Sequence, residues 1–410
     1  MTSFAKGVKC FDCGREYSPT ILACTQCGGL LDVQYDYQAI ANSLNREEMQ
    51  SKNPSIFDRW IGFLPIEDRS RIRLASLGQG PTPLIECKKL AEKIGVDHLY
   101  LKNDSIFPTG SFKDRSMPLA VAKALELGAK TLSIVSSGNA AASLAAHGAR
   151  AGLDVITFVD QEIPSPKLAQ ILIYGAKAVI VRSDYSAILR LFKNIRDRHD
   201  WYDCNSEWNS FRFEGNKTCS FEICEQLDWS TPDWVFCPMG SCTLFTAVWK
   251  GFKELVATGL ARNLPMLGGI QAENCSPVVS AFKKRMSHVE PVVPGHTIAT
   301  AISESEPPLG SKALQDLYES KGIAEGVSED QILSAVKLLA REGIFSEPAG
   351  AVSLAGAMKL AENGQIDKNE KIVCLVTGHG LKMSEIATNL LQRPEAVGLT
   401  IEEVERVLRI

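Results

Sequence analysis

No run of apolar residues in this sequence approaches the roughly 18 that a membrane-spanning helix needs, so we expect no transmembrane helix. The N-terminus lacks the apolar core of a secretory signal peptide, which predicts a cytoplasmic location. An excess of positive charge is also missing, because 44 Lys and Arg are opposed by 48 Asp and Glu. With a formal net charge of −4, the chain is not expected to bind nucleic acid or a membrane surface.

The chain also has no internal repeat and no low-complexity linker. Hydrophobic residues make up 45% of it and charged residues 22%, which are ordinary globular values and exclude a disordered or fibrous protein. A length of 410 residues is enough for two or three domains.

Cysteine, in contrast, is abundant: the chain has 12, and four of them lie within the first 27 residues. A disulfide scaffold would be shorter and secreted, so we do not expect one here. We interpret most of the later cysteines as small buried apolar residues. These later cysteines are Cys87, Cys204, Cys219, Cys224, Cys237, Cys242, Cys275 and Cys374.

The four N-terminal cysteines form two Cys-x-x-Cys-Gly sequences, at residues 10–14 and 24–28. Zinc takes four soft ligands in a tetrahedron, and two such turns on neighbouring hairpins would supply them. A bound ion would stabilise residues 1–35, which are too few to build a core of their own. We therefore predict a structural zinc ribbon with the ligands Cys10, Cys13, Cys24 and Cys27. Two redox-active Cys-x-x-Cys pairs are the alternative, although neither pair opens a helix of a βαβ unit.

After a polar arm at residues 36–82, with a short helix at 42–49, strands and helices alternate. Apolar, β-branched runs such as residues 156–159 are typical of strands that are buried on both faces. The predicted strands are 98–102, 131–136, 154–159, 177–182, 234–238, 266–271 and 371–376. The predicted helices are 88–95, 140–151, 166–174, 185–198, 217–227, 243–257, 276–285, 328–342 and 350–362.

This alternation predicts an α/β fold with two doubly wound parallel-sheet domains and a cleft between them. Residues 1–35 would form the zinc ribbon. Residues 36–130 would form the arm and the first part of a large domain, residues 131–225 a small α/β domain, and residues 226–410 the rest of the large domain with the C-terminal helices.

Ligands of open α/β sheets bind beyond the carboxyl ends of the strands, so the segments that follow the strands form the candidate site. In the first of these, Lys113 lies between Phe112 and Asp114 where a helix begins. Partial desolvation near a helix N-terminus favours the neutral amine that a lysine nucleophile needs. A surface lysine in a first helical turn is the ordinary alternative.

Three other segments combine glycine with hydroxyl or amide side chains. Residues 136–139, Ser-Ser-Gly-Asn, can bind a carboxylate or a ring oxygen, or can simply cap a helix. Residues 238–243, Pro-Met-Gly-Ser-Cys-Thr, offer amides and hydroxyls to a phosphate. Residues 377–382, Thr-Gly-His-Gly-Leu-Lys, allow close approach to the backbone or form a tight turn.

In this order along the chain, the segments resemble those of the threonine synthases, which are fold-type II pyridoxal-phosphate enzymes. The resemblance covers nearly the whole chain, and some threonine synthases also begin with a zinc-ribbon-like cysteine segment. The residues that carry it are Pro108-Thr-Gly-Ser-Phe-Lys113-Asp-Arg, Ser136-Ser-Gly-Asn139, Lys167-Leu-Ala-Gln with Tyr174-Gly-Ala-Lys177, Glu214-Gly-Asn-Lys-Thr218, Trp249-Lys-Gly-Phe-Lys, Gln271-Ala-Glu273, Thr297-Ile-Ala-Thr-Ala-Ile302, Gly343-Ile-Phe-Ser-Glu347-Pro-Ala and Thr377-Gly-His-Gly-Leu-Lys382.

The resemblance implies pyridoxal 5′-phosphate as the cofactor, bound in the cleft between the domains. Lys113 would form the Schiff base with it, beside Phe112, and would then move the α proton of the substrate. Asn139 would hydrogen-bond the ring hydroxyl, and Thr377 would face the pyridine nitrogen, which favours elimination or replacement over transamination. The cofactor phosphate would be held by Gly240, Ser241, Cys242 and Thr243.

The resemblance also implies a small amino-acid substrate that is phosphorylated, and a homodimer. Ser137 and Gly138, together with Asn139, would hold the substrate carboxylate. Asn205, Ser206 and Arg212 would bind the substrate phosphate, for which a guanidinium is well suited.

Departures from the family pattern occur where substrate specificity is expected. Ala140 stands where threonine is usual, and Gly350 where serine is common. Residues 240–244 are Gly-Ser-Cys-Thr-Leu instead of Gly-Asn-Gly-Gly-Asn, so we expect this loop to follow a different path. Residues 205–212 carry one extra residue, and Trp208 is expected to narrow the substrate pocket.

The predicted reaction is therefore that of a threonine synthase, from O-phosphohomoserine and water to threonine and phosphate. The alternative is a relative with another substrate, either a β-replacement on O-phosphoserine, as in cysteate synthase, or a serine or threonine dehydratase. A third possibility is a member that has lost catalysis and acts as a scaffold through its ribbon. The retained Lys113, Asn139, Arg212 and Thr377 argue against the third possibility.

Overall fold

The computed structural model describes residues 3–44, 55–183, 185–391 and 396–408. No helix in these ranges is long and apolar enough to cross a membrane. Helix α1 (Tyr37–Ser43) precedes most of the helix predicted at 42–49, and residues 45–49 of that prediction lie outside the described ranges.

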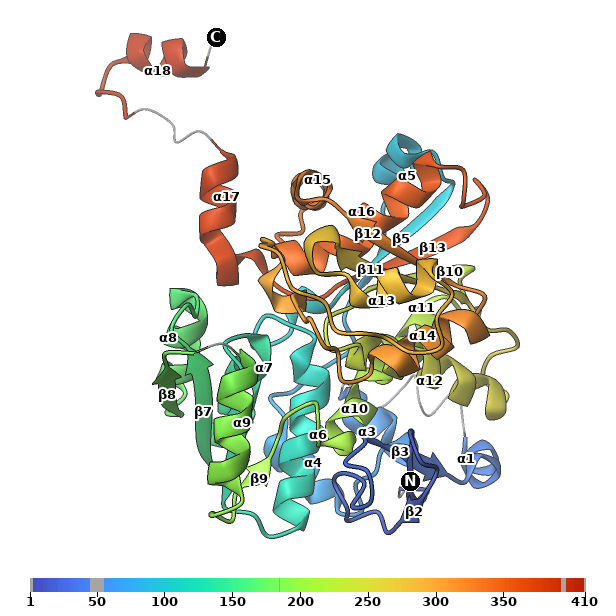
Figure 1. Cartoon of the computed structure of the whole chain (residues 1–410). Helices are drawn as coiled ribbons and strands as arrows, with labels where there is room; N and C mark the ends of the chain where they lie inside the picture. The colour runs from blue at the N-terminus through green and yellow to red at the C-terminus, as the bar shows by residue number, and fades with distance from the viewer. Residues whose placement is uncertain (1–2, 45–54, 184, 392–395, 409–410) are drawn as a thin grey trace.

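The N-terminal cysteine segment is built on a small antiparallel sheet of β1 (Ala5–Cys10), β2 (Glu16–Tyr17) and β3 (Leu31–Tyr35), in the order β2-β1-β3. Burial alternates along β3, because one face of the strand packs against the rest of the protein. This sheet lies beside helix α10 (Ser210–Asn216), at the bottom of the view in Figure 1.

The larger sheet has six strands in the order β12-β11-β10-β13-β5-β4. They are β4 (Leu84–Glu86), β5 (His98–Asn103), β10 (Trp234–Pro238), β11 (Met266–Ala272), β12 (Ile323–Val327) and β13 (Lys371–Val376). All neighbours are parallel except β4, which runs antiparallel to β5 and adds an edge that the sequence did not predict. The central strand β10 is buried along its whole length, as its uninterrupted apolar sequence predicts.

The smaller sheet has four parallel strands in the order β8-β7-β6-β9. They are β6 (Thr131–Val135), β7 (Asp154–Asp160), β8 (Lys177–Val181) and β9 (Tyr202–Asp203). The predicted α/β fold with parallel sheets is therefore confirmed. The proposed domain boundaries stay a prediction.

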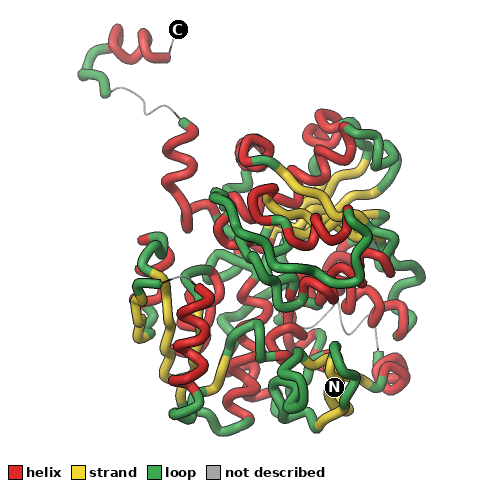
Figure 2. The backbone as a smooth tube through the Cα atoms, in the orientation of Figure 1, coloured by secondary structure: helices red, strands yellow, loops and turns green. Residues whose placement is uncertain are grey.

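Helices surround the six-stranded sheet and the four-stranded sheet (Figure 2). The helices that the sequence predicted are α5 (Lys88–Ile94), α7 (Asn139–Ala151), α8 (Ser165–Ile173), α9 (Tyr185–Arg196), α11 (Thr218–Gln226), α12 (Thr243–Ala257), α13 (Pro277–Lys283), α15 (Glu329–Arg341) and α16 (Pro348–Glu362). The sequence also predicted that a helix begins near Lys113, and this is α6 (Lys113–Glu126).

Additional helices are α3 (Ile56–Arg59), α4 (Arg69–Ala75), α10, α14 (Gly310–Glu319), α17 (Ser384–Leu390) and α18 (Ile401–Leu408). Local signals explain the best-predicted boundaries. For example, Ser328 and Gln331 form a reciprocal capping box that starts α15.

Candidate active site

Several of the predicted segments meet at one edge of the larger sheet. Strands β5, β13 and β10 are parallel neighbours, so the segments that follow them emerge on the same side. The backbone amide of Phe112 donates to the carbonyl of Thr377 at 3.0 Å, and that of His379 donates to Gly110 at 2.9 Å. These bonds hold the Lys113 segment directly against the segment that follows β13.

Lys113 is the first residue of α6 and is partly buried, with its Nζ 4.3 Å from the centre of the Phe112 ring. Desolvation, assisted by the positive charge of Arg212, lowers the pKa of Lys113 to about 7, although Glu207 and Glu347 oppose the shift. A substantial fraction of the amine is therefore neutral at neutral pH. This lysine has the properties that a nucleophile or proton-transfer group requires.

Asp114 fixes the turn that presents Lys113. Its carboxylate accepts hydrogen bonds from the Thr109 amide at 2.7 Å, the Thr109 hydroxyl at 2.6 Å and the Ser143 hydroxyl at 2.5 Å. Burial raises the pKa of Asp114, but interactions with His147 and these donors outweigh it and lower the pKa overall. The carboxylate thus stays ionised and joins the turn to α7.

Arg115 anchors the other side of Lys113. Its guanidinium is fully buried and forms ion pairs with Asp104 at 2.7 Å and Glu222 at 2.5 Å. Such fork-to-fork pairing fixes a side chain in direction as well as in distance. The first turn of α6 is therefore rigid on both sides of the candidate nucleophile.

Asn139, the first residue of α7, faces the same region. Its Nδ2 donates to Glu347 Oε1 at 2.5 Å, and Glu347 Oε2 lies 3.4 Å from Lys167 Nζ. The backbone amide of Glu347 donates to the carbonyl of Gly378 at 2.9 Å, which brings this group to the turn beside Thr377. The structure thus brings together Lys113, Asn139 and Thr377, three residues that the sequence assigned to one cofactor.

Two buried polar atoms near this turn suit a polar ligand. Asn139 Oδ1 and Ser111 Oγ are buried and have no hydrogen-bond partner among the described residues. A buried polar atom without a partner is costly, and a ligand that hydrogen-bonds to it removes the cost. An amide oxygen that accepts and a hydroxyl that can donate therefore suit a ring with polar substituents, such as that of pyridoxal phosphate.

The predicted phosphate loop follows β10 at the N-terminus of α12, a helix of 15 residues. Gly240 allows close packing of the backbone, because a Cβ there would lie only 3.0 Å from the Cα of Ile302. Cys242 adopts the left-handed conformation with φ of 64°, which glycine adopts more readily than other residues. The loop thus has a glycine-like backbone at a position where this chain has cysteine, and its Ser241 and Thr243 hydroxyls lie 3.2 Å apart.

The residues assigned to the substrate lie in segments that follow strands of the smaller sheet and in helix α10. Ser137 follows β6, and its hydroxyl accepts from the Asp160 amide at 2.8 Å, just before Gly138 and Asn139. Arg212 in α10 is buried, and its Nη1 donates to the carbonyl of Cys204 at 2.6 Å. Ser206 lies near it in sequence, and its hydroxyl donates to Glu207 at 3.4 Å.

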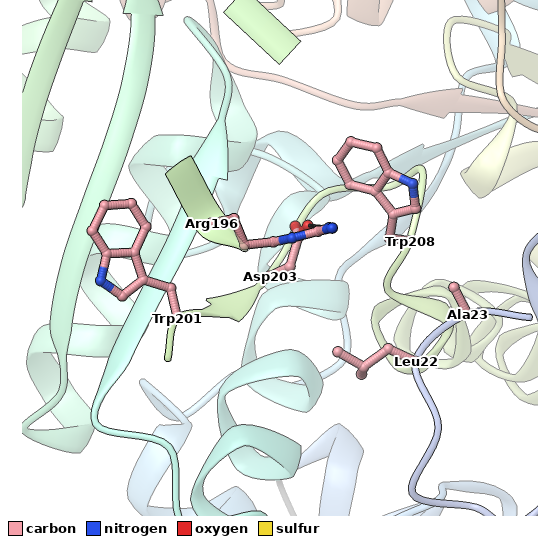
Figure 3. A pocket seen from close by; sticks show the side chains of 6 residues that line it. All are labelled: Leu22, Ala23, Arg196, Trp201, Asp203 and Trp208. Atoms are coloured by element: carbon pink, nitrogen blue, oxygen red, sulfur yellow. Dashed lines mark hydrogen bonds and ion pairs between the residues drawn. The ribbon is translucent and has the colours of Figure 1, made fainter. Parts of the chain in front are cut away.

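Asn205 and Trp208 have structural contacts that the sequence did not predict. The Oδ1 of Asn205 accepts from the Val135 amide at 2.9 Å, and its Nδ2 donates to Asp203 at 2.7 Å. Its side chain therefore ties β6 to the end of β9. The expectation that Trp208 narrows the substrate pocket stays a prediction; its ring stacks on Phe192 at 6.4 Å and lines a cavity beside the cysteine segment (Figure 3).

Three charged residues of the site received no role from the sequence. They are Glu347, Lys167 and Lys382, and each lies in a segment that carried the family resemblance. Desolvation lowers the pKa of Lys382 to about 8, and its Nζ donates to Gln170 at 2.8 Å. The sequence signal that could have indicated these residues is a charged side chain within a segment made otherwise mostly of apolar residues and glycine.

The four N-terminal cysteines form one compact cluster, with their sulfur atoms all within 4.8 Å of one another. The Cys10–Cys27 and Cys13–Cys24 sulfur pairs are 3.5 and 3.6 Å apart. Ligands at about 2.3 Å around a tetrahedral zinc ion would be roughly 3.8 Å apart, so the cluster fits zinc closely.

The turns of the cluster also have the conformation that a metal-binding knuckle needs. Gly14 and Gly28 have φ of 73° and 76°, and their amides donate to the carbonyls of Cys10 and Cys24. The other eight cysteines are buried and form no disulfide, as predicted for most of them as core residues; Cys242, which the family resemblance assigned to the phosphate loop, is buried as well.

Similarity to known proteins agrees with this site. Residues 75–378 match the family model described as pyridoxal-phosphate dependent enzyme. The chain is 42% identical over 404 residues to a threonine synthase of Methanocaldococcus jannaschii, covering 98% of this chain and 99% of that protein. It is 40% identical over 405 residues to a threonine synthase of Methanosarcina acetivorans, covering 98% of each.

Solved structures share the fold at lower identity. Maize serine racemase matches with a TM-score of 0.67 and 18% identity, over 79% of this chain and 96% of that chain. The processed form of threonine deaminase isoform 2 from Solanum lycopersicum matches with a TM-score of 0.62 and 20% identity, over 78% of this chain and 90% of that chain. At this level of identity the likeness concerns the fold.

Proposed function

Because the chain belongs to the pyridoxal-phosphate-dependent enzymes and, within them, to the threonine synthase family, we propose that it converts O-phosphohomoserine and water to threonine and phosphate. The observation that carries the proposal is Lys113, a desolvated lysine held between Asp114 and Arg115 at the meeting point of the predicted cofactor segments. The near full-length identity to threonine synthases supports the choice of reaction.

The environment of each side chain in the site suits the role that we propose for it. Lys113 Nζ would hold the cofactor and then move the proton at the α carbon of the substrate, which its lowered pKa allows near neutral pH. Bound pyridoxal phosphate supplies the electron sink for the charge that this proton leaves behind. Thr377 would face the ring nitrogen, Asn139 the ring hydroxyl, and residues 240–243 the cofactor phosphate.

Arg212 would bind the phosphate of the substrate, with Ser206, while Ser137 and Gly138 would bind its carboxylate. The buried guanidinium of Arg212 supports this assignment, since a desolvated cation binds a phosphate more strongly than an exposed one. The same positive charge acts on Lys113, so the substrate phosphate and the proton-transfer group would share one site.

The assay is direct. Purified protein with pyridoxal phosphate should release phosphate from O-phosphohomoserine and form threonine, and borohydride reduction should attach the cofactor to Lys113. Release of phosphate from O-phosphoserine without threonine would replace the proposed reaction with a β-replacement, and ammonia release from serine or threonine would select a dehydratase. A colourless protein with no labelled Lys113 would contradict the proposed chemistry as a whole.

We also propose that Cys10, Cys13, Cys24 and Cys27 bind one structural zinc ion. The sulfur separations and the two glycine turns support zinc over a pair of redox disulfides, because all four sulfurs converge on one point. Metal analysis of freshly purified protein should give one zinc per chain, and a clearly smaller amount would contradict the proposal.

Two further assignments complete the proposed function. The family resemblance predicts a homodimer, which light scattering of the purified protein would test. The cytoplasm is its proposed location, and cell fractionation would test that.

A further inference from the structure

The cysteine ribbon, residues 3–35, is bonded to the helix that carries Arg212. Ser210, the first residue of α10, is fully buried, and its hydroxyl accepts from the Leu31 amide at 2.7 Å and donates to the Leu22 carbonyl at 3.0 Å. The Ser210 amide donates to the same carbonyl at 3.4 Å. The ribbon therefore supplies both partners of this buried hydroxyl.

Two further contacts hold the same helix from the ribbon. Phe11, which follows Cys10, packs edge-to-face on Phe213 with the ring centres 6.0 Å apart. Tyr35 at the end of β3 donates its hydroxyl to Glu214 at 2.9 Å in the buried interior. Three of the seven residues of α10 are thus in contact with residues of the ribbon.

The ribbon residues that bind Ser210 flank the second cysteine pair. Leu22 precedes Cys24 by two residues, and the Cys24 amide donates to the carbonyl of Gly29 at 2.8 Å. Ala23 pairs with Leu30 through an antiparallel bridge, which places Leu22 and Leu31 at the open end of this loop. The geometry of the cysteine pair therefore sets the positions of the two groups that bind Ser210.

A cavity borders this end of α10 on the side of the ribbon. Leu22 and Ala23 form one wall of a cavity of about 310 Å³, which Trp208, Trp201, Arg196 and Asp203 line on the other side (Figure 3). An open cavity has no atoms to resist a shift of the residues that border it. Next to this cavity, the hydrogen bonds to Ser210 fix the start of the helix on the ribbon side together with the packing of buried residues such as Phe211.

From Ser210 the helix leads directly to the active site. Asn209 caps α10 by accepting from the amides of Phe211 and Arg212 at 3.2 and 3.3 Å. After desolvation, the charge of Arg212 is the next largest influence that lowers the pKa of Lys113, which means that the guanidinium acts on the candidate nucleophile. A displacement at Ser210 would move Arg212 relative to Lys113.

We propose that the cysteine ribbon is a positioning element of the active site, in which Ser210 acts as a positioning residue that holds Arg212 for a phosphorylated substrate. The proposal rests on the proposed function, because it assigns Arg212 to the substrate phosphate. It adds a task to the ribbon, which would otherwise be a stabilising N-terminal appendage.

The test compares Ser210→Ala with Ser220→Ala in the cofactor-loaded enzyme. Ser220 is an equally buried serine whose hydroxyl donates to the Val248 carbonyl at 2.7 Å, away from the ribbon. Ser210→Ala should raise KM for O-phosphohomoserine and weaken the binding of inorganic phosphate by roughly 5- to 30-fold, as expected when one or two hydrogen bonds are lost. The absorption spectrum of its cofactor should stay at the wild-type value, its kcat should fall by a smaller factor than its KM rises, and Ser220→Ala should change neither constant.

Two results would overturn the proposal. One is a Ser210→Ala enzyme with wild-type KM and phosphate affinity. The other is a variant that loses kcat, cofactor binding and phosphate affinity together to the same extent as Ser220→Ala, which would indicate a purely structural role. Inorganic phosphate binding, measured by calorimetry, keeps the test independent of the reaction: if the wild type makes no threonine, the proposed function fails while the dependence of phosphate affinity on Ser210 is still measured.

Phe11→Leu provides a second route should Ser210→Ala fold poorly. It removes the ring contact with Phe213 from the other end of the ribbon and leaves every hydrogen bond of Ser210 in place. We expect a smaller rise in KM and the same unchanged cofactor spectrum. An unchanged KM and phosphate affinity in this variant would contradict the proposal in the same way.

Discussion

Replacing Glu222 with glutamine should reveal how strongly the buried charges around Arg115 stabilise the protein. Glu222 Oε1 accepts from Arg115 at 2.5 Å, while Oε2 accepts from Lys102 at 2.6 Å and from the Thr82 amide at 3.1 Å. Glutamine keeps the shape but turns one of these acceptors into a donor that faces other donors. The substitution also leaves two buried cations with one fewer negative partner.

The size of the expected loss in the free energy of unfolding follows from the pKa of Glu222. Burial raises its pKa, but Arg115 and Lys102 outweigh burial and lower the pKa from 4.5 to about 2. Since one pKa unit corresponds to about 1.4 kcal/mol, the ionised form contributes about 3 kcal/mol to the free energy of unfolding. Because the pKa is lowered in the folded state, this contribution is present above pH 4.5 and is lost as the pH falls towards 2.

The loss in the free energy of unfolding is measured by urea titration at pH 7, with tryptophan fluorescence as the signal. Glu225→Gln is the matched control, because Glu225 lies on the same helix and is paired with Arg59 at 2.7 Å. Desolvation raises the pKa of Glu225, so its ionised form is disfavoured in the folded protein and its neutralisation should cost much less. Equal losses in the two variants, or an unchanged stability of Glu222→Gln at pH 7, would refute the reasoning.

Further predictions concern the site and the ribbon. Lys113→Ala should abolish turnover and borohydride labelling, and in the apoenzyme the rate of Lys113 acylation should rise with pH through about 7, because the neutral amine reacts. Cys242→Gly should keep the affinity for pyridoxal phosphate, whereas Cys242→Val should lower the melting temperature, since branching at Cβ adds strain at φ of 64°. Cys13→Ser should lower the zinc content and increase proteolysis of the ribbon, and unchanged metal analysis would contradict the assigned ligand set.

The strands and helices were largely predictable because their signals are local. The uninterrupted apolar sequence of β10 indicates burial on both faces, and the spacing of the cysteines indicates two Cys-x-x-Cys turns. Neither prediction needs information about residues that are distant in the chain. The edge strands β4 and β12 and the short strand β9 escaped prediction. Strands β4 and β9 have only three and two residues, which is too little periodicity to distinguish them from loops, and β12 has the sequence Ile-Ala-Glu-Gly-Val, in which Glu and Gly interrupt the apolar pattern.

The candidate site was predictable only in part. Lys113 could be found because a lysine after Gly-Ser-Phe at a helix start is chemically unusual, and the family resemblance gave it a role. The hydrogen bond between Asn139 and Glu347 joins residues 208 positions apart, so no local pattern indicates it. The family resemblance assigned Asn205 to the substrate phosphate, whereas only the folded chain shows that its side-chain amide is hydrogen-bonded to Val135 and Asp203.

The sequence by itself determined the order of the elements, the pattern of the four clustered cysteines and the identity of the central lysine, since each depends on neighbours along the chain. Only the tertiary structure decided that the ribbon docks on α10, that Arg212 acts on Lys113 and that Trp208 lines a cavity beside the ribbon. The reason is physical: hydrophobic pattern and backbone preference specify local conformation, whereas the pairing of distant surfaces depends on shape and hydrogen-bond partners that exist only in the folded chain.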